Sequence, residues 1–175
     1  MKQGVSIKGN TGRKLRLSVI VMVDRERGRA EAYLGSLLGQ SRIESMEILL
    51  LDFAPKSVPP LSASRHPAVR TVKLDYSTGY GPARAKGVRM ARSAVVGFLE
   101  EHATARPGWA EAILKAYEKE WAGVGPEFHN PTPGRGMSDL VYLTAFGDWV
   151  PPLAPGESRL FPGQNGTFRR DVLLG

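Results

Sequence analysis

The stretch Glu100-Glu101-His102 carries the residue types best suited to binding a cation. It follows the apolar run 94–99, which has the length and β-branched content of a strand. Residues two apart in an extended segment point to the same side, so Glu100 and His102 could share one ion. A carboxylate with an imidazole suits Mn²⁺, and Mg²⁺ less well because magnesium prefers oxygen ligands. The alternative is an ordinary acidic loop start without a ligand.

Polar residues follow three other apolar runs in the same way. These are Asp24 after 17–23, Asp52 after 46–51, and the segment 75–81 after 69–74. Because ligands bind outside the carboxyl ends of the strands in open parallel sheets, we expect these ends to converge on one binding cleft. A single acid after a strand is also a common turn residue, so each position alone keeps that second interpretation.

Arg84 is a cation on the apolar side of a predicted helix. If this helix begins near Gly81, Arg84 lies in line with Val88 on the face that packs inward. Its guanidinium could then reach the cleft and hold a phosphate or a carboxylate. The alternatives are an ion pair with Asp52 or Glu100, or a side chain that extends to water. The other cations of the helix are predicted to face solvent: Lys86, Arg89 and Arg92.

These candidate residues are positioned by an alternation of strands and helices. The four apolar runs above predict strands, and between them lie an amphipathic stripe from Ala30 to Leu38 and the helix around Arg84. A further helix is predicted after Pro107. The alternation indicates an α/β fold, a Rossmann-like and mostly parallel sheet flanked by helices. From Val124 to Gly175, glycine and proline predict loops and short elements laid against the sheet.

Composition narrows the function classes. The chain has 175 residues, no cysteine and a net charge of +7. The absence of cysteine excludes thiol nucleophiles, disulfides and cysteine-bound metals. Residues 1–16 hold five of the seven surplus positive charges, so the remainder carries +2, and we expect no nucleic-acid partner. No apolar run approaches the roughly 18 residues of a membrane span. We expect a cytoplasmic protein, with association at a membrane surface left open.

Together these features resemble the family-2 inverting glycosyltransferases with the A-type nucleotide-sugar fold. The segments that carry the resemblance are Leu17–Asp24, Leu49–Asp52, Gly81–Gly87 with Arg84 at the motif arginine, Phe98–His102 where the family has Phe-Leu-Asp-x-Asp, Pro107–Trp109, and Pro162–Arg170, which is similar to Gly-x-Asn-x-x-Phe-Arg-Arg. Two departures are Phe53, where a second acid often follows Asp52, and His102 in place of an aspartate.

The resemblance implies a glycosyltransferase that takes a sugar from a nucleotide-diphospho sugar to an acceptor hydroxyl on a saccharide or a lipid-linked molecule. It assigns Asp24, Asp52, Arg84, Glu100 and Glu101 to the nucleotide sugar, Glu100 and His102 to a divalent cation (Mn²⁺ or Mg²⁺), and Trp109, Asn165, Arg169 and Arg170 to the acceptor side. Family members usually carry the general base beyond the Arg-Arg segment, so no catalytic residue is assigned and a truncated chain is expected.

The resemblance also divides the chain. We expect a flexible basic arm over 1–14 and a single domain over 15–175, with a nucleotide-sugar-binding half (15–123) and a partial acceptor-side half (124–175). A homodimer or a partner subunit could complete the site.

Two other functions remain open. One is a non-catalytic nucleotide-sugar-binding module that lacks the base. The other is a nucleotidyltransferase, which would normally have a glycine-rich basic loop after its first strand, whereas 22–28 contains one glycine.

Overall fold

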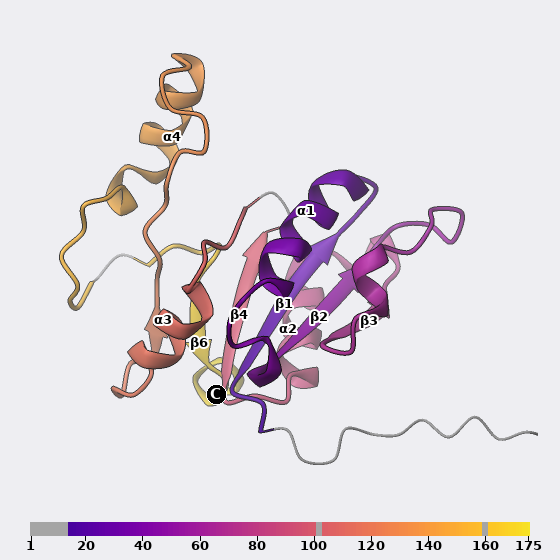
Figure 1. Ribbon diagram of the computed structural model, residues 1–175. Helices are drawn as coiled ribbons and strands as arrows, with labels where there is room; N and C mark the ends of the chain where they lie inside the picture. The colour runs from indigo at the N-terminus through magenta and orange to yellow at the C-terminus, as the bar shows by residue number, and fades with distance from the viewer. Residues whose placement is uncertain (1–13, 101–102, 159–160) are drawn as a thin grey trace, which may run out of the picture.

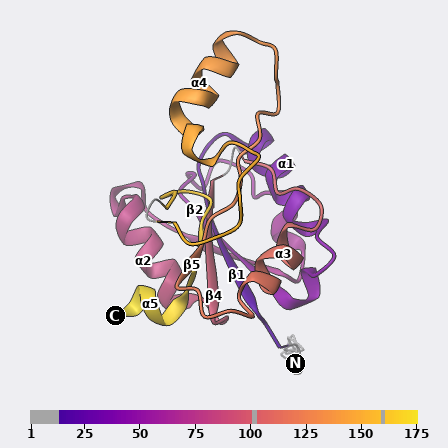
Figure 2. The ribbon, with the colours of Figure 1, turned by 90° about the vertical axis from the view of Figure 1, so that its left-hand side faces the viewer.

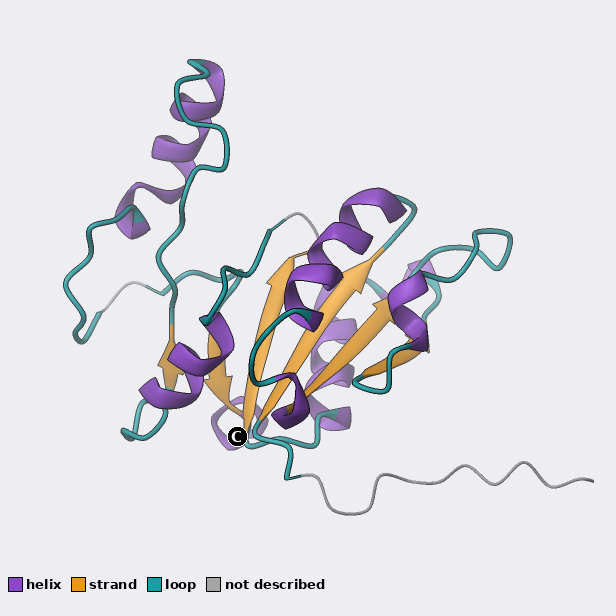
Figure 3. Cartoon of the chain, viewed as in Figure 1, coloured by secondary structure: helices purple, strands orange, loops and turns teal. Residues whose placement is uncertain are grey.

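A twisted sheet between two layers of helices forms the body of the protein (Figures 1 and 3). The computed structural model describes residues 14–100, 103–158 and 161–175. In chain order the elements are β1 (Leu17–Val23), α1 (Arg27–Leu38), η1 (Ile43–Ser45), β2 (Met46–Asp52), η2 (Ser62–Arg65), β3 (Val69–Lys73), η3 (Tyr76–Thr78), α2 (Tyr80–Met90), β4 (Val95–Glu100), α3 (Trp109–Ala116), β5 (Gly123–Val124), α4 (Met137–Phe146), η4 (Gly147–Trp149), β6 (Thr167–Arg169) and α5 (Arg170–Leu174).

The six strands follow the order β3-β2-β1-β4-β6-β5. Strands β1 to β4 are mutually parallel, whereas β6 runs antiparallel to both β4 and β5. The mostly parallel α/β sheet predicted from the four apolar runs is therefore confirmed. Four boundaries differ by a residue. Strand β3 ends at Lys73 instead of Leu74, and β4 begins at Val95 instead of Ala94. Strand β2 includes Asp52 and β4 includes Glu100, so both acids are the last residues of strands and not the first of loops.

Side chains alternate along the buried strands and fill two separate cores. On β1, Val19 and Val21 face the core under α1 and α3, while Ile20 faces the core under α2. Figure 2 views the sheet along its edge, with α1 and α3 on one side and α2 and α5 on the other. Burial of each such aliphatic side chain contributes about 1.5–3 kcal/mol, so both layers hold the sheet firmly.

Helix α2 approaches the sheet closely because it carries a glycine at the point of contact. A Cβ on Gly87 would lie 2.8 Å from Cδ1 of Ile20, which is too close for carbon atoms. The buried side of α2 consists of Ala83, Gly87 and Val88. Arg84 is next to these buried residues in α2 and is itself half-buried. Its predicted position on the inward face of the helix is therefore correct in part.

The segment from Gly123 onward agrees with the predicted arrangement only in part. Short elements do lie at the sheet, but two of them, β5 and β6, are strands that extend it, and the sequence did not predict them as strands. Helix α4 stands away from the sheet instead of lying against it (Figures 1 and 2). Aromatic side chains within this protruding segment pack on one another, with Phe128 near Phe146 at 4.8 Å between ring centroids and near Trp149 at 6.1 Å. The aromatic side chains of this segment thus pack on one another, and no residue of α4 is buried.

Within the described residues, no helix is long and apolar enough to cross a lipid bilayer.

Candidate functional site at the carboxyl ends of the strands

Asp52 and Glu100 end on the two sides of β1 at one edge of the sheet. Asp52 pairs in register with Val23, and Glu100 pairs with Met22. Strands β2 and β4 are therefore two strand spacings apart, about 10 Å. The predicted meeting of the strand ends at one edge of the sheet is confirmed, whereas their convergence on one binding cleft stays a prediction.

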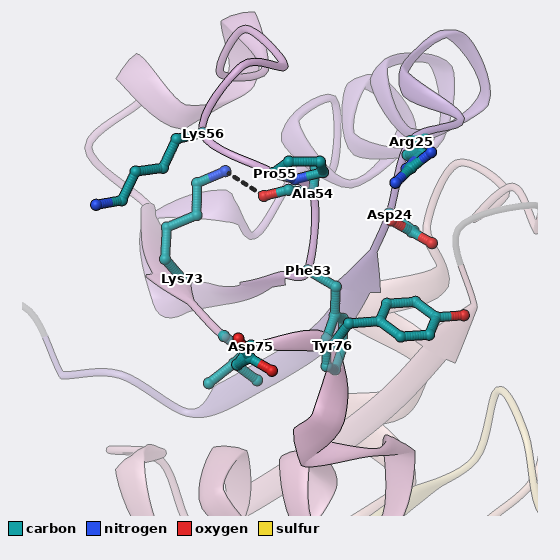
Figure 4. A pocket seen from close by; sticks show the side chains of 10 residues that line it. Asp24, Arg25, Phe53, Ala54, Pro55, Lys56, Lys73, Asp75 and Tyr76 are labelled. Atoms are coloured by element: carbon teal, nitrogen blue, oxygen red, sulfur yellow. Dashed lines mark hydrogen bonds between the residues drawn. The ribbon is translucent and has the colours of Figure 1, made fainter.

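A pocket of about 770 Å³ opens between the ends of β1, β2 and β3 (Figure 4). Its lining residues are Asp24 and Arg25 after β1, Phe53, Ala54, Pro55 and Lys56 after β2, and Lys73, Leu74, Asp75 and Tyr76 at the end of β3. Half of these residues are apolar, and the others include both carboxylates and cations. The volume of this pocket lies within the range of small-ligand sites.

Asp52 precedes the lining residues Phe53 and Ala54 and is enclosed by partners from its own chain. Its side chain is 2% exposed. One oxygen accepts hydrogen bonds from Arg27 at 3.1 Å and from the Ala54 N–H at 3.0 Å; the other accepts from Arg27 at 3.0 Å and pairs with Lys73 at 2.8 Å. Burial alone would raise the pKa of Asp52, but the bonds from Lys73, Arg27 and Ala54 outweigh it and hold the pKa below its ordinary value. Asp52 is therefore a charged carboxylate at neutral pH.

The two acids that line the pocket, Asp24 and Asp75, differ from Asp52 in their surroundings. Asp24 is half-buried, and within the described part of the chain its carboxylate has no hydrogen bond or ion pair. Asp75 is exposed and caps η3, accepting from the backbone N–H and the hydroxyl of Ser77. These two bonds lower the pKa of Asp75. Among the described residues of the pocket, Asp24 and the second oxygen of Asp75 thus keep acceptor capacity for a ligand.

Three aromatic rings form one side of the site, and no sequence pattern identified them. Phe53 makes edge-on contacts with Tyr76 at 6.3 Å and with Tyr80 at 5.7 Å between centroids. Phe53 is buried, whereas Tyr76 is 69% exposed and lines the pocket. In Figure 4 the Tyr76 ring extends toward Asp24. Phe53, in the position where a second acid was expected by resemblance, therefore supports an exposed ring instead of adding charge.

Arg84 lies nearer to β4 than to the pocket. Its guanidinium carbon is 5.6 Å from the centroid of the Phe98 ring, a cation–π contact. The Nε atom of Arg84 is buried and has no hydrogen-bond partner among the described residues. The alternative of an ion pair with Asp52 is not observed, because Arg27 and Lys73 occupy both oxygens of that carboxylate.

Glu100 is the described member of the predicted metal-binding stretch. It is half-buried, and its backbone N–H donates a hydrogen bond to Asn165 at 3.0 Å. The other predicted residues, Glu101 and His102, lie outside the described residues. Within the described residues, no group of three or more histidine, aspartate or glutamate side chains could hold a metal ion. The predicted divalent cation therefore remains a prediction.

The predicted acceptor-side residues are spread over the molecule. Asn165 lies beside the end of β4 through its bond to Glu100, and Trp109 packs against the core under α1 and α3. Arg169 pairs in register with Val95 at the opposite end of β4, and its guanidinium donates to the carbonyls of Trp121 and Lys119. Arg170 donates to the carbonyls of Val88 and Arg89 at the end of α2. The structure does not bring these two arginines together with the pocket.

The strand order and the pocket at the carboxyl ends define an α/β protein with the glycosyltransferase A-type, nucleotide-diphospho-sugar transferase fold. The model of the family "Glycosyl transferase family 2" matches residues 18–153, so the chain belongs to glycosyltransferase family 2.

Solved structures share this fold at low sequence identity. A mannosyltransferase from Pyrobaculum calidifontis, solved with GDP-Man and Mn²⁺, is 20% identical with a TM-score of 0.65, over 91% of this chain and 46% of that one. Residues 1–349 of S. aureus TarS are 16% identical with a TM-score of 0.66, over 91% and 48%. The same TarS segment solved with UDP-GlcNAc is 19% identical with a TM-score of 0.60, over 70% and 36%.

This chain therefore spans less than half the length of these structures. No curated protein sequence matches it.

Proposed function

We propose that this chain binds a nucleotide-diphospho sugar at the carboxyl edge of its sheet and serves in the transfer of that sugar to an acceptor hydroxyl. In the proposal, the nucleoside occupies the pocket between β1, β2 and β3, and the diphosphate extends toward the end of β4. The observation that carries the proposal is the gathering of four strand ends, with the pocket at one end of the row and Glu100 at the other.

The dimensions of the edge agree with such a ligand. Strands β3 and β4 are three strand spacings apart, about 14 Å, which an extended nucleoside diphosphate can span. At the β3 end, the exposed Tyr76 ring offers a face on which a nucleobase can stack. Two of the structures with the same fold hold GDP-Man and UDP-GlcNAc, ligands of this class.

The residues of the site have distinct parts in the proposal. Asp24 accepts a hydrogen bond from the base or the ribose, and Tyr76 covers the base. Arg84, next to β4 and carrying a fixed positive charge, favours the diphosphate end of the donor. Transfer also needs a carboxylate or another base to take the proton of the acceptor hydroxyl, and no described residue is assigned to that role.

Dependence on a divalent cation belongs to the proposal as well. Glu100 would supply one carboxylate oxygen, and His102, the second predicted ligand, lies outside the described residues. A cation there would neutralise charge on the leaving diphosphate. Because the described residues contain no group of three potential ligands, the proposal assigns the cation no separate step.

The test is calorimetric titration of the full chain with UDP, GDP and TDP, each with and without Mn²⁺. We expect at least one nucleoside diphosphate to bind, and Glu100→Gln to weaken the part of the affinity that needs Mn²⁺. Glu120→Gln is the matched control, because Glu120 is an exposed acid after α3. Absence of binding by all three nucleotides would refute the proposal.

A second assay separates transfer from binding. Samples that bind a nucleoside diphosphate are incubated with the corresponding nucleotide sugars, and release of the free nucleotide is measured. Release that requires Glu100 supports the transferase. Binding without any release would instead support the non-catalytic nucleotide-sugar-binding module.

A further inference from the structure

The carboxylate of Asp52 has no capacity left for a ligand. Its two oxygens offer about four lone-pair directions, and four hydrogen-bond contacts from Arg27, Ala54 and Lys73 already fill them. With 2% of the side chain exposed, a nucleobase could reach Asp52 only by displacing these partners. Such a displacement would leave the largely buried guanidinium of Arg27 without its carboxylate, which is costly.

Lys73 differs from Asp52, because its ammonium group is held by two contacts while its side chain stays accessible to a ligand. Its ammonium group binds Asp52 at 2.8 Å and the Ala54 carbonyl at 3.2 Å, so two of its three N–H donors are engaged. Its side chain is 46% exposed and lines the pocket. Figure 4 shows Lys73 extended along the pocket wall toward Ala54. The third donor is thus held at a fixed place on the wall.

The rest of the pocket offers a ligand next to Lys73 both apolar groups and charges of both signs. Apolar groups of Phe53, Leu74 and Tyr76 line the same pocket, and a stacked aromatic ring requires such groups. The carboxylates of Asp24 and Asp75 share the pocket with the cations of Arg25 and Lys56, so the lining presents acceptors and donors together. A nucleobase with a carbonyl oxygen and a ring N–H can pair with both kinds of group, because the oxygen accepts from the Lys73 ammonium and the N–H donates to a carboxylate of the pocket.

We propose that Lys73 is the specificity-determining residue of the nucleoside pocket, donating a hydrogen bond to a carbonyl oxygen of the base, and that Asp52 is a positioning residue that holds Lys73. This inference rests on the proposed function. It replaces the expectation that Asp52 itself contacts the nucleoside. Uracil, thymine and guanine present such a carbonyl, whereas adenine does not.

The test is a double-mutant cycle read by nucleotide affinity. Dissociation constants of UDP, GDP and ADP are measured for the wild-type chain, Lys73→Met, Asp52→Asn and the double variant. Lys73→Met should weaken binding of the preferred carbonyl-bearing nucleotide about tenfold or more, the value of a hydrogen bond from a charged donor, and narrow its advantage over ADP. Lys73→Arg, which keeps a charged donor, should retain part of that advantage.

Asp52→Asn should weaken binding to a similar extent in the wild-type background and have little further effect once Lys73 is methionine. If the Asp52→Asn loss persists undiminished in the Lys73→Met background, Asp52 contacts the base itself and the inference is wrong. Should Asp52→Asn fail to fold, the Lys73 variants still decide, because Lys73 is half-exposed on an edge strand. Lys86→Met, an exposed lysine of α2, is the matched control.

Comparison of UMP with UDP separates the base from the phosphates. A Lys73→Met loss that is equal for the two nucleotides supports a contact to the base, whereas a larger loss for UDP assigns Lys73 to the diphosphate and overturns the inference. A change within twofold for every nucleotide also overturns it. If the wild-type chain binds no nucleotide, the proposed function and this inference are both wrong. If the wild-type chain binds a nucleotide and Lys73→Met leaves the affinity unchanged, only the inference is wrong.

Discussion

Asn165 joins the C-terminal segment to the end of β4, and substitutions there should separate two physical contributions. It is 8% exposed and has a φ of 56°, in the left-handed region that most side chains avoid. Its side-chain oxygen accepts the hydrogen bond of the Glu100 N–H at 3.0 Å. Asn165 therefore supplies both an acceptor and a backbone conformation that asparagine tolerates.

The expected costs follow from these two contributions. Loss of the acceptor leaves a partly buried N–H without a partner and costs about 1–2 kcal/mol. A left-handed alanine costs about 1–2 kcal/mol more, whereas glycine adopts that conformation freely and costs about 0.5–1 kcal/mol through the unfolded chain. We expect Asn165→Ala to lower the free energy of unfolding by about 2–4 kcal/mol, and Asn165→Gly by about 1 kcal/mol less. Asn165→Asp, which keeps an acceptor, should remain within about 1 kcal/mol of wild type.

Urea denaturation of the four proteins, followed by circular dichroism, measures these free energies. Equal costs for alanine and glycine would show that the positive φ contributes nothing. An aspartate variant as unstable as the alanine variant would refute the role given to the side-chain acceptor. The amide proton of Glu100 should also exchange faster with solvent in the alanine and glycine variants.

Three shorter predictions concern the rest of the molecule. The pKa of Asp52 is lowered in the folded state, so its stabilising contribution is present above about pH 4, the pKa in the unfolded chain, and is lost as the pH falls through the folded pKa. Urea denaturation from pH 7 to pH 3 should show this loss of unfolding free energy in the wild-type chain and not in Asp52→Asn. Tyr33 is fully buried, and its hydroxyl has no partner among the described residues, so Tyr33→Phe should change the unfolding free energy by 0 to about +1 kcal/mol, and a clear destabilisation would reveal a missed partner. Arg170→Met removes two bonds to the end of α2 and should cost about 1–2 kcal/mol in thermal or urea denaturation while leaving nucleotide affinity within twofold of wild type.

The sequence predicted the central part of the fold because its signals are strong there. The runs 17–23 and 46–51 are almost entirely apolar, and such runs fit strands covered on both faces. Once those strands are parallel, their carboxyl ends must meet at one edge, which placed Asp24, Asp52 and Glu100 on the same side of the sheet. The later strands β5 and β6 have two and three residues, too few for any periodicity to show.

The pairing partners of Asp52 could not be predicted from the sequence. Arg27 lies among several arginines around the start of α1, and Lys73 lies at the end of an alternating strand. Nothing in either pattern separates them from solvated surface cations. Only the register of Asp52 with Lys73 between β2 and β3, and the position of α1 over the sheet, bring these charges together.

The two ends of the candidate site depend on different parts of the chain. The pocket is built from three strand ends between Asp24 and Tyr76, so the first three strands suffice to place its lining. The end of β4 also depends on the C-terminal segment, since Asn165 binds the Glu100 N–H and Gly166 accepts from Phe98. A substitution that loosens β6 from β4 should therefore disturb the diphosphate end and leave the nucleoside pocket in place. Affinity for a nucleoside monophosphate would then survive, while the additional affinity gained from the second phosphate would fall.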